Sequence, residues 1–92
     1  MQPIKTFAIV ILEIMESLSV KEKLQDIYLD LNIRRFADRY FGRSGGWLYH
    51  KFDRVDVNHN GHPDDFSEEQ LLILKQGLYD FSERIRKAAD QL

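Results

Sequence analysis

Apolar residues recur along this chain at alternating steps of three and four, which is the spacing of one face of an α-helix. The first such stretch follows Pro3, a residue suited to a first helical turn, and its repeat positions are Ile4, Phe7, Ile11, Ile14 and Leu18. Further apolar residues extend the surface around the helix and indicate burial on more than one side: Ala8, Ile9, Val10, Leu12 and Met15. The pattern therefore predicts a first helix over residues 3–18.

Capping residues predict the next two helices. Ser19 begins the sequence SVKE, a capping box in which the serine oxygen accepts a hydrogen bond from the Glu22 amide. The predicted inward face of this second helix consists of Val20, Leu24, Ile27 and Leu31. Asn32 caps a third helix, which ends before Gly42 because glycine suits the left-handed position just past a helix end. The apolar residues of the third helix are Ile33, Phe36, Ala37, Tyr40 and Phe41.

Two further helices complete the predicted fold. Ser44 caps the fourth, whose apolar residues are Trp47, Leu48 and Phe52. The capping box SEEQ at residues 67–70 begins the last helix, and Phe66 is placed to pack against Leu71. The repeat of this helix is Leu71, Leu74, Leu78, Phe81, Ile85, Ala88 and Leu92. We therefore predict an all-α fold of about five helices, with a central helix-turn-helix and a long C-terminal helix, in one domain over residues 1–92.

The amino-acid composition indicates the cellular compartment of the protein. The chain contains no cysteine, which excludes disulfides and thiolate metal sites and favours a reducing cytoplasm. Glu13 and Glu16 interrupt the first apolar run, which is also too short to span a membrane. We expect a cytoplasmic protein without a membrane segment.

The charges are unevenly distributed along the chain. The formal net charge is −2, yet between Asn32 and Arg54 six Lys and Arg residues stand against two Asp residues, a local charge of +4. The segments on either side are both net acidic. A basic segment inside an acidic protein attracts an anionic partner locally, although such a cluster is also compatible with ordinary solvated helix charges.

Residues 32–54 have the layout of a helix-turn-helix. Such a unit needs a small residue on its first helix, a glycine in the turn and apolar anchors on its second helix. Ala37, Gly42 and the pair Leu48 and Phe52 meet these requirements in order. The separation of Ala37 from Gly42 is one residue greater than in the common repressor-type unit. The first helix is therefore expected to be one residue longer or to end differently.

The candidate DNA-binding residues surround the start of the fourth helix. Backbone amides at such a start bind phosphate, and side chains on the outer face, above all Tyr49 and His50, are placed to reach bases. Gly45 and Gly46 either allow close backbone approach to DNA or only loosen the helix start. Trp47 is assigned to the core. The full candidate set is Arg34, Arg35, Arg39, Arg43, Ser44, Gly45, Gly46, Tyr49, His50, Lys51 and Arg54.

A family resemblance rests on the segment RYFGRSGGWLYHKF, followed by GHPDDFSEEQ and a long amphipathic helix. These residues resemble a domain-of-unknown-function family of short helix-turn-helix-like proteins from gut Bacteroidetes. Its members carry a Tyr-Phe-Gly-Lys/Arg-Ser turn, a Trp-Leu/Phe-Tyr helix and a Gly-x-Pro loop. The resemblance covers residues 33–85 and implies a helical fold with a helix-turn-helix, without an established activity. Gly45 and Gly46 depart from it, because relatives have small polar or basic residues there, and the loop from Asp56 is longer and more acidic.

The polar loop before the last helix has a partial calcium motif. Five residues match positions one, three, five, six and nine of a calcium-binding loop: Asp56, Asn58, Asn60, Gly61 and Asp64. The match fails at the last position, where Ser67 replaces the required bidentate glutamate, so the motif is a weak metal candidate. His59 and His62 offer a transition-metal alternative, although histidines in a turn are more often solvated.

Two hypotheses from different functional classes remain. No nucleophile is paired with a base in the sequence pattern, so we expect neither an enzyme nor a cofactor. The first hypothesis is a helix-turn-helix transcriptional regulator that binds double-stranded DNA, as a homodimer through its N- and C-terminal helices. The alternative is a helical protein-interaction or dimerisation module that does not bind DNA. Its support is the surplus of apolar surface on the first and last helices.

Overall fold

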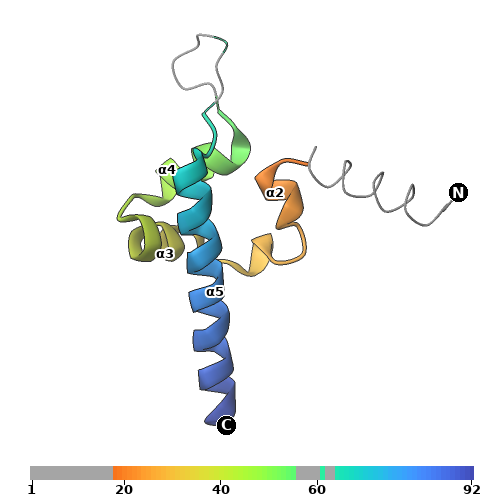
Figure 1. Ribbon diagram of the computed structural model, residues 1–92, viewed down its shortest axis with the longest axis vertical. Helices are drawn as coiled ribbons and strands as arrows, with labels where there is room; N and C mark the ends of the chain where they lie inside the picture. Colours follow the sequence, from red (N-terminus) through yellow and green to blue (C-terminus); the bar gives the residue numbers. More distant parts are fainter. Residues whose placement is uncertain (1–17, 56–60, 62–63) are drawn as a thin grey trace, which may run out of the picture. The chain divides into compact units, whose positions relative to one another are not determined.

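The computed structural model describes residues 18–55, 61 and 64–92, so the predicted helix over residues 3–18 lies almost wholly outside the described part. The described elements are α2 (Val20–Lys23), the 3₁₀ turn η1 (Tyr28–Asp30), α3 (Ile33–Phe36), the π turn η2 (Ala37–Phe41), α4 (Gly45–Asp53) and α5 (Glu68–Asp90) (Figure 1). They include no strand, which confirms the all-α prediction for this part of the chain. The chain divides into two units, Met1–Leu31 and Asn32–Leu92.

The second predicted helix is shorter than expected. Ser19 caps it as predicted, because its Oγ accepts a hydrogen bond from the Glu22 amide at 3.2 Å. The helix ends at Lys23, and a turn and η1 follow in place of further helical residues. Weak helix formers such as Asp26 and Asp30 are frequent in this stretch, which explains the early end. Of the predicted inward face, Val20, Leu24 and Leu31 are half-buried and Ile27 is 37% exposed.

The third predicted helix is confirmed, with one change of geometry. Asn32 Oδ1 accepts a hydrogen bond from the Arg35 amide at 3.1 Å and so caps α3. The helix then widens into the π turn η2, which accommodates one residue more than an α turn. This widening explains the extra residue between Ala37 and Gly42. Gly42 ends the helix at φ +63°, where its amide and that of Arg43 both donate to the Ala37 carbonyl.

The fourth and fifth helices begin as predicted. Ser44 Oγ accepts from the Trp47 amide at 3.2 Å, and α4 ends at Asp53, followed by the C-cap residue Arg54 at φ +53°. At α5, Ser67 and Gln70 form both hydrogen bonds of the capping box. Phe66 packs edge-on against the Phe52 ring, with the ring centroids 5.2 Å apart, and this contact joins the start of α5 to α4.

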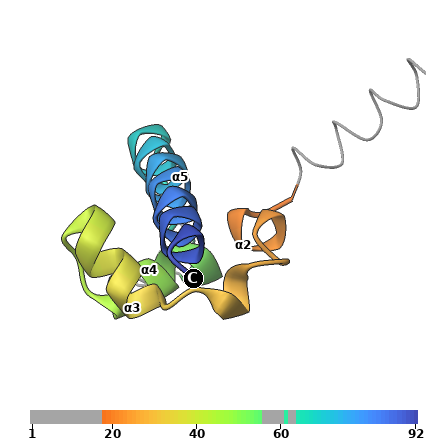
Figure 2. The ribbon, with the colours of Figure 1, turned by 90° about the horizontal axis from the view of Figure 1, so that it is seen from below.

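The core of the second unit lies where α3, η2 and α4 meet the first half of α5. Its buried apolar residues are Ile33, Phe36, Ala37, Leu48, Phe52 and Leu74. Gly77 of α5 is buried against the rings of Phe36 and Tyr40, which places η2 beside α5 (Figure 2). The Tyr40 hydroxyl donates to Asp80 Oδ2 at 2.6 Å and accepts from Arg84 at 3.2 Å. Packing and hydrogen bonds therefore both set the position of α5.

The second half of α5 extends beyond α3 and α4 of its own unit (Figure 1). Of the seven positions in the predicted apolar repeat, only Leu74 is buried. Leu78 and Phe81 are half-buried, whereas Ile85 is 54% exposed and Leu92 is fully exposed. The repeat is therefore a core-facing stripe only near the start of the helix. None of the described helices combines the length and the apolar character needed to cross a bilayer.

Gly77→Ala tests the contact between α5 and η2. The added Cβ would lie 2.9 Å from Tyr40 Cγ and 3.0 Å from Phe36 Cζ. Overpacking of this kind costs about 1–3 kcal/mol, which exceeds the helix-propensity gain of about 1 kcal/mol from replacing glycine. We expect Gly77→Ala to lower the free energy of unfolding in urea denaturation. The exposed neighbouring change Gln76→Ala is the control, and a stability of Gly77→Ala equal to that control would contradict the contact.

Candidate nucleic-acid interface

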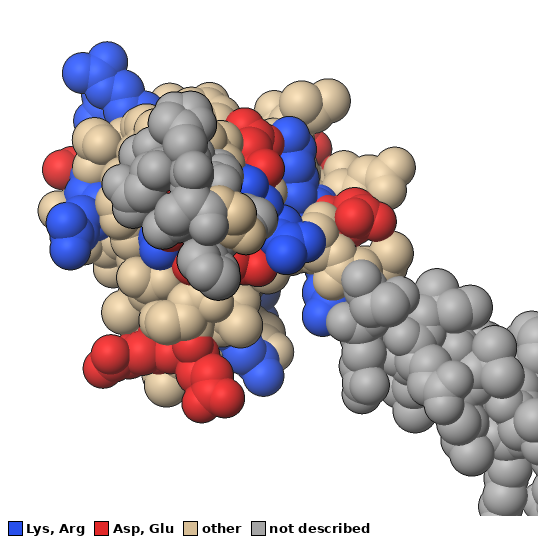
Figure 3. Space-filling view, turned by 90° about the horizontal axis from the view of Figure 1, so that it is seen from above, with Lys and Arg blue, Asp and Glu red and all other residues tan. Residues whose placement is uncertain are grey.

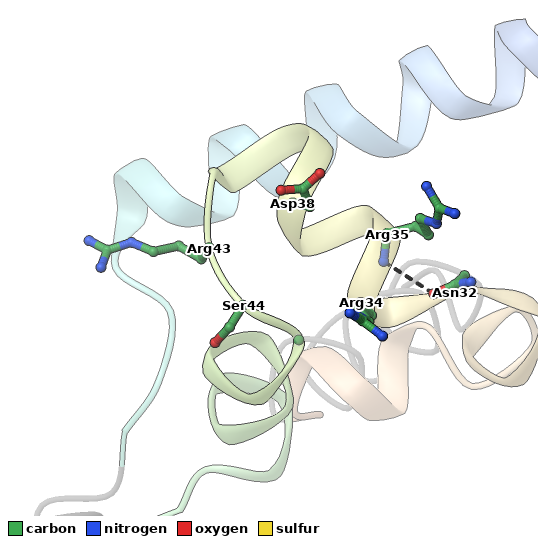
Figure 4. A pocket seen from close by; sticks show the side chains of 7 residues that line it. Asn32, Arg34, Arg35, Asp38, Arg43 and Ser44 are labelled. Carbon is green, nitrogen blue, oxygen red and sulfur yellow. Dashed lines mark hydrogen bonds between the residues drawn. The ribbon is translucent and has the colours of Figure 1, made fainter.

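A hollow of about 650 Å³ lies where the start of α3 meets the start of α4 (Figure 4). The residues that line it are Asn32, Arg34, Arg35, Asp38, Arg43, Ser44 and Gly45. Three arginines and one carboxylate give the lining a positive charge. Five of the eleven candidate DNA-binding residues line this hollow, namely Arg34, Arg35, Arg43, Ser44 and Gly45.

The arginines around the hollow do not point into a single spot. Figure 4 shows the guanidinium groups of Arg35 and Arg43 extending away from each other on opposite sides of it. Arg39, on η2, is exposed but is not part of the lining. Among the described residues, no carboxylate lies within ion-pair distance of Arg34, Arg35 or Arg39. These three cations are therefore available to an anionic partner over a broad surface.

The two adjacent glycines at the start of α4 have different roles. A Cβ on Gly45 would lie 3.1 Å from Arg34 Cα, so Gly45 allows α4 to approach the backbone of α3 closely. A Cβ on Gly46 would meet nothing nearer than Ser44 Oγ at 3.9 Å. Gly45 is therefore explained by helix packing inside the unit, and only Gly46 leaves the backbone open to an outside partner.

The outer face of α4 carries Tyr49 and His50, as the sequence pattern predicted. Tyr49 is 44% exposed, and Gly46, His50 and Asp53 are exposed as well. Leu48 and Phe52 are buried on the opposite side, as a helix-turn-helix requires of its anchors. The side chains available to base edges are thus few, with Tyr49 and His50 the largest.

Trp47 is packed between polar and apolar neighbours. Its ring lies 5.1 Å from that of Phe41, centroid to centroid, and it is half-buried. Arg43 Cζ and Lys51 Nζ each lie 5.5 Å from the centroid of the indole, within cation–π range. The indole therefore belongs to the packing of the unit, as predicted, and also restricts two of the candidate cations.

Two of the candidate cations are already engaged by acidic residues. Lys51 Nζ lies 2.7 Å from Asp64 Oδ1 and donates to the Asp65 carbonyl at 3.0 Å. Arg54 Nε lies 3.2 Å from Asp65 Oδ2. On the face seen in Figure 3, positive and negative side chains are interspersed. The +4 segment is therefore partly neutralised by residues that follow it in the chain.

The weak metal candidate is largely outside the described residues. Asp56, Asn58 and Asn60 lie there, and Asp64 forms the ion pair with Lys51. In the part of the chain that is described, no group of three metal-ligating side chains comes together.

Sequence reasoning missed four residues that shape this surface. Asn32 was recognised only as a cap, yet it lines the hollow together with Asp38, which follows Arg34 by one helical turn. Asp64 and Asp65 were not connected with the cations of α4, because a loop separates them in sequence. The two adjacent aspartates that follow the basic helix were the signal in the sequence, but this signal does not show which cation each aspartate pairs with.

Alanine at each of the two glycines tests their different roles. Gly45→Ala forces a shift of the α3 backbone, whereas Gly46→Ala enters open space and gains up to about 1 kcal/mol of helix propensity. We expect Gly45→Ala to be less stable than Gly46→Ala by about 1 kcal/mol or more in thermal and urea denaturation. Equal stabilities would contradict the close approach of α4 to α3.

Comparison with known proteins places the chain in a family. Residues 20–92 match the family described as Domain of unknown function (DUF5053), and this match covers most of the chain. No curated protein and no solved structure matches the chain. On the strength of the match over residues 20–92, this protein belongs to the DUF5053 family.

Proposed function

We propose that this protein binds double-stranded DNA through a helix-turn-helix formed by α3, η2 and α4, and that it acts as a transcriptional regulator. The observation that carries the proposal is the hollow at the start of α4, which Arg34, Arg35 and Arg43 line together with the capping residue Ser44. Cationic side chains and helix-terminal amides are the groups that bind the DNA backbone.

The contacts follow from the arrangement of the two helices. Arg34, Arg35 and Arg39 are exposed along the first helix of the unit, where phosphate contacts position a protein on the duplex. The outer face of α4 enters the major groove, with Gly46 letting the helix start approach closely. Tyr49 and His50 are then the side chains that reach base edges. Because these are few, most of the affinity comes from the backbone and depends strongly on salt.

A second candidate function is protein–protein association without DNA binding. It is favoured by the exposed apolar side chains on the face of the predicted repeat, where Leu71 and Ile85 lie along α5 and Leu92 follows its end. Contiguous exposed apolar surface is typical of interaction sites. The two functions are compatible in a homodimer, because two-fold operators are usually read by dimers. We also propose that the relatives of this chain are the short helix-turn-helix-like proteins of gut Bacteroidetes that its sequence resembles.

A titration of labelled mixed-sequence duplex DNA at about 50 and 200 mM salt tests the regulator. We expect binding to weaken steeply with salt, with a slope of log K against log salt that falls by about 0.9 for each phosphate contact removed. Arg34→Ala combined with Arg35→Ala removes two such contacts. Arg86→Ala combined with Lys87→Ala, two exposed cations at the far end of α5, is the charge-matched control. Binding that is absent, or that falls equally in the control, would contradict the proposed interface.

Light scattering over a range of protein concentrations tests association through α5. We expect the mass to rise toward a dimer, and Ile85→Glu to prevent the rise because it places a charge on an exposed apolar position. Lys87→Glu, also exposed on α5, introduces the same group away from the apolar repeat and is the control. A monomer at all concentrations, or equal effects of the two changes, would contradict association through this face.

A further inference from the structure

Hydrogen bonds and an ion pair hold the segment before α5 against the end of α4. The Asp64 amide donates to the Val55 carbonyl at 2.8 Å, and Lys51 Nζ is held by Asp64 Oδ1 and by the Asp65 carbonyl. The Lys51 side chain is only 11% exposed, so these contacts are part of the packing of the unit. They hold Asp65 in a fixed place beside Arg54.

The ion pair between Asp65 and Arg54 is of a different kind. Its side chains are 46% and 54% exposed, respectively, and the Nε–Oδ2 distance is 3.2 Å. Ion pairs this exposed are weak and are screened by salt. Asp65 also accepts a hydrogen bond from the Phe66 amide through its other oxygen, Oδ1, at 2.8 Å, so the carboxylate stays in place without Arg54. The guanidinium group, in contrast, can exchange Asp65 for another anion.

The position of Arg54 suits a phosphate on the DNA strand opposite the one near the hollow. Helix α4 has nine residues, which corresponds to a length of about 13 Å at 1.5 Å per residue. The major groove of B-DNA is about 12 Å wide. A helix of this length lying across the groove would bring its two ends to opposite phosphate backbones. Its first end carries the hollow, and its last end carries Arg54.

We propose that Asp65 is an autoinhibitory latch that occupies Arg54 and withholds it from DNA phosphate. This inference rests on the DNA-binding function proposed above. Arginine binds phosphate in a bidentate manner with charge-assisted hydrogen bonds, so a phosphate at this position competes with the Asp65 carboxylate. The unlatched state carries one more free cation at the interface, so release of the latch adds one phosphate contact to DNA binding.

The test is the DNA affinity of Asp65→Asn in the full chain. Asparagine keeps the oxygen that accepts from the Phe66 amide but removes the charge that holds Arg54. We expect tighter binding to the labelled mixed-sequence duplex. The ratio of its affinities at 50 and 200 mM salt should grow about threefold over that of the wild type, the effect of one added phosphate contact. The charge-matched control is Asp90→Asn at the exposed end of α5.

Arg54→Ala, alone and combined with Asp65→Asn, completes a double-mutant cycle for the latch. We expect Asp65→Asn to raise the affinity only while Arg54 is present, so that Arg54→Ala combined with Asp65→Asn binds no more tightly than Arg54→Ala alone. A gain that survives in the double variant would overturn the latch, because it would not pass through Arg54.

The remaining outcomes separate the latch from the proposed function. Salt-dependent binding by the wild type with no gain in Asp65→Asn beyond Asp90→Asn would overturn the latch and leave DNA binding intact. Binding by Asp65→Asn alone would support both proposals. An absence of binding in every variant would overturn both.

Discussion

The close approach of α4 to α3 at Gly45 is the contact on which the candidate interface depends. Because Gly45 has no side chain, the first turn of α4 lies against the backbone at Arg34. This contact places Ser44 and the amino end of α4 beside Arg34 and Arg35, and so creates the hollow. A side chain at this position would force the backbone at Arg34 away from α4. Two adjacent glycines are unfavourable at a helix start, and packing between α3 and α4 explains the first of them, Gly45.

The second constraint is the way in which α5 is held. Gly77 receives the rings of Phe36 and Tyr40, and Tyr40 is in turn hydrogen-bonded to Asp80 and Arg84. The first half of α5 therefore completes the core of the helix-turn-helix, while its second half extends with apolar residues exposed. One helix thus stabilises the proposed DNA-reading unit and also carries the exposed apolar residues proposed for association. The first half of α5 has the first role, and the second half has the other.

The charges of the basic segment do not act as one group. Arg34, Arg35 and Arg39 are exposed without an acidic partner in the described residues, whereas Lys51 and Arg54 are paired with Asp64 and Asp65. Arg43 lies over the Trp47 ring. The local charge of the sequence therefore overstates the positive field at the interface. A partner meets a surface that is most basic along α3 and η2 and partly neutralised at the end of α4.

The helix starts in the second unit, its turn glycine and most of its core followed from sequence, because capping and apolar periodicity are local properties of the chain. Ser44, Ser67 and Gly42 act as predicted for this reason. The early end of α2, the contact of Gly45 with Arg34 and the pairing of Asp65 with Arg54 did not follow. Each of the last two joins residues separated by a turn or a loop. Only the tertiary structure brings such residues together, because packing distances between helices depend on the shapes of both surfaces, and neither surface is encoded in the local pattern.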